Sequence, residues 1–196
     1  MRIRTDARRQ AIISQASAVF REHGFAGASM SLIAARCGGS KATLYGYFRC
    51  KHDLLMAVMH DATETQADAM MAIFDHVEDC PRATLIAFGH AYLDLTNSPE
   101  ILAVKRIGIS EGRDEAIGGL IYDQGPCRGL SMIAEHLQSW IDRGLLRDAN
   151  TRVMAMHLRA LLDANAEPVL YGAEPEFARE PAVAEAIDTF LRAYRA

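Results

Sequence analysis

Apolar residues recur at spacings of three and four along nearly the whole chain, and this periodicity constrains the fold more than any other feature. Over residues 127–143, one such row consists of Leu130, Ile133, Ala134, Leu137 and Ile141. This spacing places side chains on one face of an α-helix. The sequence has no sustained runs in which β-branched and polar residues alternate, as a half-buried strand requires. The sequence therefore predicts an all-α protein.

Glycines and changes of pattern divide the chain into two parts. Short helical segments precede and follow Gly38-Gly39, and a long helical pattern begins at Lys51 and continues to about residue 77. We therefore expect a three-helix N-terminal domain over residues 1–52. The long helix would join it to a larger helical domain over residues 53–196.

The two parts differ in charge. Residues 1–51 contain nine Lys/Arg and two Asp/Glu, whereas residues 52–196 contain twelve Lys/Arg and twenty-three Asp/Glu. A basic segment on an acidic body is typical of a protein that meets a polyanion at one end. A solvated basic face without a partner would have the same composition, so charge alone leaves both interpretations open.

Several classes of protein are disfavoured by what the sequence lacks. No apolar run approaches the roughly 20 residues of a membrane helix, so we expect a cytoplasmic protein with no membrane partner. The histidines show no metal-binding spacing and the cysteines form no CxxC pair, so we expect neither a metal nor a cofactor. We expect reduced thiols, with a redox role for Cys37 or Cys50 as the alternative. The cysteines are Cys37, Cys50, Cys80 and Cys127.

Residues 38–55, GGSKATLYGYFRCKHDLL, have to be assigned to one of two kinds of site. A phosphate-binding loop requires GxxxxGK[ST] after a buried strand, because its backbone N–H groups must converge on the phosphates. The run from Gly38 to Lys41 lacks the first glycine of that motif and follows a helical segment. A phosphate loop is therefore disfavoured.

A helix-turn-helix agrees better with this stretch. Ala34 supplies the small residue that two crossing helices need, and Gly38 supplies the positive φ that the turn needs. Ser40 is placed to cap the second helix. The outer surface of that helix would then present side chains suited to phosphates and base edges in a DNA major groove, namely Lys41, Thr43, Tyr45, Gly46 and Tyr47. A helical hairpin inside a larger bundle is the alternative.

The same segments resemble the DNA-binding domain of the TetR/AcrR family of bacterial transcriptional regulators. Residues 9–25 are similar to its first helix, residues 29–48 to its helix-turn-helix and residues 51–58 to the start of its fourth helix. The resemblance implies contacts from the recognition helix, with Ser29 and Lys51 on phosphate. The candidate DNA-binding residues are Ser29, Ser40, Lys41, Ala42, Thr43, Tyr45, Gly46, Tyr47 and Lys51.

Three departures from the family pattern concern this region. Gly39 stands where the family usually has a branched apolar residue, which predicts a less firmly seated recognition helix. Tyr47 replaces a frequent histidine. Cys50 and His52 replace the usual Ser and Glu at the start of the fourth helix, which would weaken its cap by about 1 kcal/mol.

Residues 101–107 followed by Glu111-Gly112-Arg113, together with residues 122–126, resemble the C-terminal domain of the AefR-like subgroup. Apolar and aromatic side chains of the middle helices, beside many methionines, are candidates to line a site for a hydrophobic or aromatic small-molecule effector. These candidates are Phe88, Tyr92, Ile107, Ile121 and Tyr122. Each of them would equally suit an ordinary core.

The resemblance also implies a homodimer held by a four-helix bundle from the last two helices, predicted over residues 151–171 and 181–194. The candidate interface residues are Met154, Leu158, Leu161, Leu162, Ala184, Ile187 and Leu191. A dimer has a physical reason as well, because two recognition helices about 34–36 Å apart would read successive major grooves of a pseudo-palindromic operator on double-stranded DNA.

The sequence thus predicts a dimeric DNA-binding transcriptional regulator, a repressor that a small hydrophobic or aromatic ligand releases. We do not expect an enzyme, since no Ser/His/Asp, Cys/His or carboxylate set shows an ordered spacing. A helical adaptor that binds protein, or an enzyme on a helical scaffold, remains the alternative.

Overall fold

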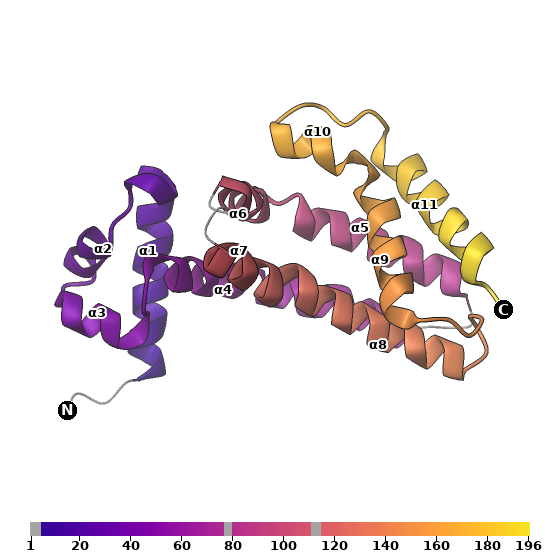
Figure 1. The fold of residues 1–196 in the computed structure, drawn as a ribbon, viewed down its shortest axis with the longest axis horizontal. Coiled ribbons are helices and arrows are strands. Elements are labelled where there is room, and N and C mark those ends of the chain that lie inside the picture. Colours follow the sequence, from indigo (N-terminus) through magenta and orange to yellow (C-terminus); the bar gives the residue numbers. More distant parts are fainter. Residues whose placement is uncertain (1–4, 77–79, 111–114) are drawn as a thin grey trace. The chain divides into compact units, whose positions relative to one another are not determined.

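The computed structural model describes residues 5–76, 80–110 and 115–196. It divides into two compact units, Met1–Glu64 and Thr65–Ala196. Within the described residues every regular element is helical, apart from an isolated bridge that pairs Leu146 with Arg195 (Figure 1). The prediction of an all-α fold is confirmed.

The N-terminal unit contains α1 (Asp6–Gly27), α2 (Met30–Arg36), α3 (Lys41–Tyr47) and the first part of α4 (Lys51–Ala72). Figure 1 shows α2 and α3 together on one side of α1. The hydroxyl of Thr5 caps α1 by accepting from the N–H of Arg8 at 3.3 Å. Near its other end, Gly24 with φ of 65° interrupts the regular helix.

Apolar side chains from all four helices form one core in this unit. The i, i+3, i+4 rows that the sequence shows are its source, because they give each helix one apolar face. Helices as short as α2 and α3 are unstable alone, so this burial is what holds them in place. The fully buried members include Ile12, Ile13, Ala16, Val19, Ile33, Leu44 and Leu54.

The second unit contains the rest of α4 and a longer series of helical elements. In chain order they are a 3₁₀ turn (Ile73–His76), α5 (Pro81–Thr96), α6 (Pro99–Ser110), α7 (Glu115–Tyr122), a π-helical turn (Asp123–Cys127), α8 (Arg128–Asp142), α9 (Thr151–Leu162), a 3₁₀ turn (Asp163–Asn165), α10 (Ala166–Tyr171) and α11 (Arg179–Tyr194). In Figure 1, α9 lies between α8 and α11.

The prediction of one continuous helix over residues 151–171 is wrong. A 3₁₀ turn at Asp163–Asn165 separates α9 from α10. Pro168 accounts for the break, because proline has no N–H to donate and its ring clashes with the carbonyl four residues earlier. The long helix that begins at Lys51 ends its α-helical part at Ala72, and its predicted end at about residue 77 lies outside the described residues.

The core of the second unit is built mainly from α5, α8, α9 and α11, with Phe88, Trp140 and Phe190 as its largest buried side chains. Gly89 lies where α5 approaches its neighbours most closely. A Cβ at this position would lie 2.9 Å from Cγ1 of Val183 and 3.0 Å from Cδ2 of Leu162. The absence of a side chain therefore allows α5 to pack directly on α9 and α11.

The described ranges contain neither a membrane-spanning helix nor a cluster of metal ligands. None of their helices has the length and apolar character needed to cross a membrane. No three His, Cys, Asp or Glu side chains of those ranges come together as a metal-binding group.

Candidate nucleic-acid interface

Hydrogen bonds fix both helices of the helix-turn-helix. The Ser29 hydroxyl accepts from the N–H of Leu32 at 3.1 Å and caps α2. Gly38 has φ of 60°, the left-handed conformation that favours glycine, and the Ser40 hydroxyl accepts from the N–H of Thr43 at 3.1 Å to cap α3. The predictions for the turn at Gly38 and the cap at Ser40 are confirmed.

The recognition helix α3 presents three residues to solvent. Lys41 and Ala42 are exposed, and Tyr45 has 51% of its surface exposed. Thr43 and Gly46 are half-buried, and the Thr43 hydroxyl lies 3.0 Å from that of Ser40. An ammonium, a methyl group and a phenol therefore lie on the outer side of α3, where each suits a phosphate or a base edge.

Tyr47 lies less outward than the helical pattern predicted. It is half-buried and packs against the core of its unit. Its phenolic oxygen accepts from the N–H of Thr5 at 3.2 Å. The side chain therefore ties the end of α3 to the start of α1, and its contact with DNA stays a prediction.

Lys51 has a structural role that the sequence did not reveal. Its ammonium donates to the carbonyls of Phe25 at 2.7 Å and Ala28 at 3.0 Å, and it lies 4.2 Å from the centre of the Phe25 ring. Lys51 thus satisfies carbonyls at the end of α1. An ammonium has three donors, so one N–H is left for the phosphate contact that the sequence predicts.

The start of α4 is capped by sulfur. The thiol of Cys50 accepts from the N–H of Asp53 at 3.5 Å, and the Asp53 carboxylate accepts from the N–H of Arg49 at 3.1 Å. The two bonds form a reciprocal cap. The acidic residue of this cap is Asp53, one position after His52, where the family usually has Glu. The His52 ring instead packs on Phe25, with the ring centres 4.8 Å apart.

We expect Cys50→Ser to raise the free energy of unfolding by about 0.5–1 kcal/mol, because a hydroxyl oxygen is a stronger cap acceptor than sulfur. Urea denaturation measures the change. Cys50→Ala is the matched control and should not be stabilised, since it removes the acceptor. A serine variant no more stable than the alanine variant would show that the side chain at 50 does not cap α4.

The cysteines of this region differ in environment. Cys37 is half-buried, and burial raises the pKa of its thiol, although nearby Arg8 acts in the opposite direction. A raised pKa keeps the thiol protonated and therefore weakly reactive. Cys50 is exposed, and its thiol serves the cap described above.

The predicted effector residues lie in two places in the second unit. Phe88 is fully buried and Tyr92 is 7% exposed, with their rings 6.0 Å apart on α5. Ile107 and Ile121 are half-buried on α6 and α7, and Tyr122 is 48% exposed. Glu111, Gly112 and Arg113, part of the subgroup resemblance, lie outside the described residues.

A polar cluster around Tyr92 was missed by sequence reasoning. The Tyr92 hydroxyl donates to Asp163, 3.1 and 3.0 Å from its two carboxylate oxygens. Burial raises the pKa of Asp163, which the Lys105 ammonium and the Tyr92 hydroxyl partly oppose. Burial also lowers the pKa of Lys105, whose ammonium donates to the carbonyl of Thr96 at 3.0 Å. No local pattern signals a pair 71 positions apart.

We expect Tyr92→Phe to raise the pKa of Asp163 further and to cost about 1 kcal/mol of stability, the typical contribution of one hydrogen bond. The Tyr92 hydroxyl stabilises the ionised form of Asp163, so the deficit in the free energy of unfolding should be complete above the folded-state pKa of Asp163 in the variant, which is the higher of the two. The deficit should shrink as the pH falls through the pKa of the variant and then that of the wild type, below which the carboxyl is neutral in both proteins. Denaturation from pH 7 downward measures this, and a deficit that does not change with pH would contradict the pairing.

Four of the predicted interface residues lie inside their own chain. Exposure is 0% for Met154, Leu158 and Ile187, and 5% for Leu162. The other three, Leu161, Ala184 and Leu191, are half-buried. The row that α9 does expose consists of Val153, Met156, His157 and Ala160. Both faces of α9 carry apolar residues, so periodicity could not show which face points inward.

A capped helix-turn-helix with exposed Lys41 and Tyr45, on a basic unit followed by a larger helical unit, defines a DNA-binding transcriptional regulator. Residues 12–58 match the bacterial regulatory proteins of the tetR family, and residues 83–196 match the C-terminal domain of AefR-like transcriptional repressors. The second match alone spans more than half of the chain, and the protein belongs to the TetR family. The resemblance seen in the sequence is confirmed.

Related proteins agree with this assignment. The transcriptional activator FasR of Mycolicibacterium smegmatis is 28% identical over 142 residues, which cover 63% of this chain and 64% of that protein. The chain thus matches less than two thirds of the length of this curated relative. Members of this family are transcriptional regulators, so the protein is a regulator and not an enzyme.

Solved structures share the fold. A TetR-family regulator from Mesorhizobium loti superimposes with a TM-score of 0.82 at 23% identity, with both chains covered completely. The flavonoid-responsive regulator FrrA gives 0.72 at 23% identity, covering 97% of this chain and 98% of its own. SmeT in complex with triclosan gives 0.65 at 25% identity, covering 97% and 93%.

Proposed function

We propose that the protein represses transcription by binding a pseudo-palindromic operator as a homodimer, and that a small hydrophobic or aromatic effector releases it. The observation that carries this proposal is the outer side of α3, where Lys41, Ala42 and Tyr45 are exposed on a helix whose start is capped by Ser40. A regulator of this kind acts on DNA in the cytoplasm.

Two properties of the chain support a dimer. The recognition helix has seven residues and presents few side chains, so one copy would read few base pairs, whereas two copies would read two half-sites. In addition, α9 exposes Val153 and Met156, at 43% and 53%, on the same face. Apolar residues exposed in a row suit burial against a second copy.

An effector of hydrophobic or aromatic character suits the second unit. Its interior is built from aromatic and methionine side chains around Phe88, with a polar group at Tyr92 and Asp163 that could orient a ligand. FrrA is described as flavonoid-responsive, and SmeT is known in complex with triclosan. Release requires that the effector bind the DNA-competent and DNA-incompetent states with unequal affinity.

Repression is the direction that the C-terminal domain supports, because residues 83–196 match AefR-like repressors. FasR, in contrast, is an activator. Deleting the gene and measuring transcription of its neighbours separates the two. We expect transcripts to increase, and a decrease would show activation.

DNA binding is tested with labelled DNA from the promoter region beside the gene of the protein, against an unrelated fragment of equal length. We expect a sequence-dependent complex whose affinity falls with salt in proportion to the phosphates neutralised. Light scattering should give a mass twice 21.6 kDa. The absence of sequence-dependent binding at moderate salt would contradict the proposal and favour a protein-binding adaptor.

A further inference from the structure

The space beside Gly39 is occupied by another side chain, whereas its backbone conformation needs no glycine. Gly38 has a positive φ, but Gly39 does not. A Cβ built on Gly39 would lie 3.0 Å from Nη2 of Arg8, closer than an ordinary van der Waals contact. The volume that a side chain at 39 would occupy is therefore taken by the guanidinium of Arg8, which comes from α1.

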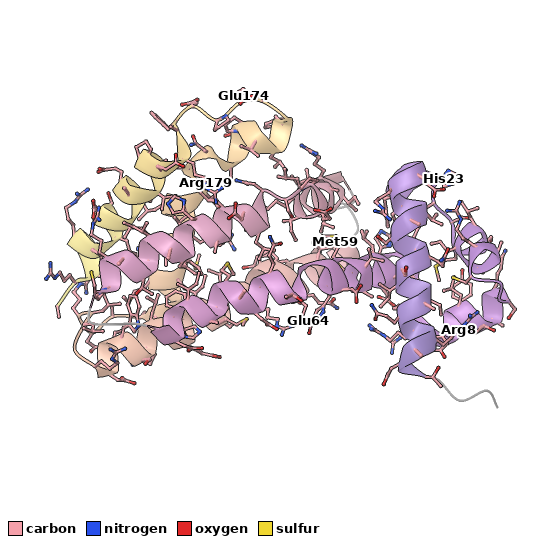
Figure 2. The ribbon with its side chains drawn as sticks, turned by 180° about the vertical axis from the view of Figure 1, so that it is seen from behind. Arg8, His23, Met59, Glu64, Glu174 and Arg179 are labelled. Atoms are coloured by element: carbon pink, nitrogen blue, oxygen red, sulfur yellow. The ribbon has the colours of Figure 1, made fainter. Side chains whose placement is uncertain are left out.

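Arg8 is held in this place by a hydrogen bond. Its Nη2 donates to the carbonyl of Cys37, just after α2, at 3.0 Å. Figure 2 shows Arg8 between the lower part of α1 and the short helices beside it. Only a pocket of about 10 Å³ remains next to the guanidinium, bordered by Ile12, Ser40, Thr43 and Leu44 among others, and this is room for no more than one water molecule.

The same turn of α1 also contacts the other end of α3. The N–H of Thr5 donates to the hydroxyl of Tyr47 at 3.2 Å, and the guanidinium of Arg9 lies 5.4 Å from the centre of the Phe48 ring. Residues 5–9 therefore contact the turn before the recognition helix through Arg8, and the end of that helix through Thr5 and Arg9.

We propose that the first turn of α1 positions the recognition helix. Arg8 fixes the position at which α3 begins, because its guanidinium fills the space that a side chain at position 39 would occupy. Arg8 is thus a positioning residue, acting through the Cys37 carbonyl rather than through DNA. A guanidinium suits this role because it is planar, always charged and forms stronger hydrogen bonds to carbonyls than a neutral donor does. The effect on DNA binding rests on the function proposed above.

The arrangement predicts that a valine at position 39 can replace the Arg8 guanidinium, because a branched apolar side chain at 39 would occupy the same space. Arg8→Ala should weaken operator binding about tenfold, as expected for the loss of one charge-assisted hydrogen bond. Gly39→Val should also weaken it, since the valine displaces Arg8. The double variant should bind within about threefold of the wild type, because the two residues are in contact and their effects are not additive.

Salt dependence separates positioning from a direct phosphate contact. If Arg8 neutralised a phosphate, its loss would reduce the magnitude of the slope of log K against log salt by about 0.9 per subunit, or about 1.8 for the dimer, and valine at 39 would not restore binding. That result, or an Arg8→Ala variant that binds like the wild type, would overturn the proposal. Arg21→Ala is the matched control, since it removes the same charge from an exposed position of α1 and should change affinity little.

Hydrogen exchange of the amides of residues 40–48, measured without DNA, tests positioning independently of DNA binding. We expect about tenfold faster exchange in Arg8→Ala and restored protection in the double variant. Unchanged exchange in Arg8→Ala would overturn the positioning role even if DNA binding is confirmed. If the amides exchange as expected but the protein binds no DNA, the proposed function is rejected and the positioning role of Arg8 is retained. Arg8→Lys keeps the charge and serves if the alanine variant does not fold; protection equal to the wild type in Arg8→Lys would overturn the role of the guanidinium.

Discussion

Replacing Phe88 by alanine should lower the free energy of unfolding by about 3–5 kcal/mol. The side chain has no exposed surface, and its ring centre lies 4.8 Å from that of Phe74 and 6.0 Å from that of Tyr92. Neighbouring Gly89 packs so closely on Val183 that little room exists for the helices to close the cavity. The variant therefore loses both the buried apolar surface and the contacts around it.

Chemical denaturation measures this loss, with Tyr171→Ala as the control. Tyr171 is an aromatic residue of the same unit but is 80% exposed, so its replacement should change stability by no more than about 0.5 kcal/mol. The same measurement tests whether Phe88 lines an effector cavity. A loss below about 1 kcal/mol for Phe88→Ala, accompanied by a changed response to effector, would place Phe88 in a ligand cavity instead of the core.

Tyr45→Ala should weaken operator binding by about tenfold to a hundredfold while leaving stability nearly unchanged. Half of the Tyr45 surface is exposed on the outer side of α3, so the side chain contributes little to the core. A contact with a phosphate or base edge contributes about 1–3 kcal/mol, which corresponds to that range of affinity. Tyr45 is a cleaner probe than Tyr47, whose removal would also loosen the end of α3.

Fluorescence anisotropy with operator DNA measures the effect, and Tyr122→Ala is the matched control. Tyr122 is a tyrosine of similar exposure, 48%, in the other unit, so without effector its loss should not change DNA binding. Tyr45→Phe separates the hydroxyl from the ring. Wild-type affinity in Tyr45→Ala would remove this residue from the interface and leave Lys41 and Ala42 as the exposed candidates on α3.

The parts of the site that could be predicted depend on short-range interactions. Ser29 and Ser40 cap helices through bonds to residues three positions away, and Gly38 supplies a local backbone conformation. Each of these requirements is met within one turn of chain, so the residue types themselves reveal it. For the same reason, the amino-acid sequence is sufficient to locate the helix-turn-helix.

The effector and interface residues could not be assigned in this way. Periodicity shows that α9 has apolar residues on more than one face, but it does not show that Met154 lies inside while Met156 is 53% exposed. That choice depends on which neighbouring helices cover α9. The pairing of Tyr92 with Asp163 depends likewise on how α5 packs beside the end of α9.

The surroundings of position 39 depend on both the residue type and the tertiary structure. The resemblance to the TetR family indicated that a branched apolar side chain is missing at Gly39, and the residue type is sufficient to show this because side-chain volume is a property of the residue. The folded chain showed that Arg8 fills the space and donates to Cys37, 29 positions along the chain. A contact of that range exists only once the core of Ile12, Ala34 and Leu44 has brought α1, α2 and α3 together, since burial of apolar surface, and no local pattern, sets the distance between them.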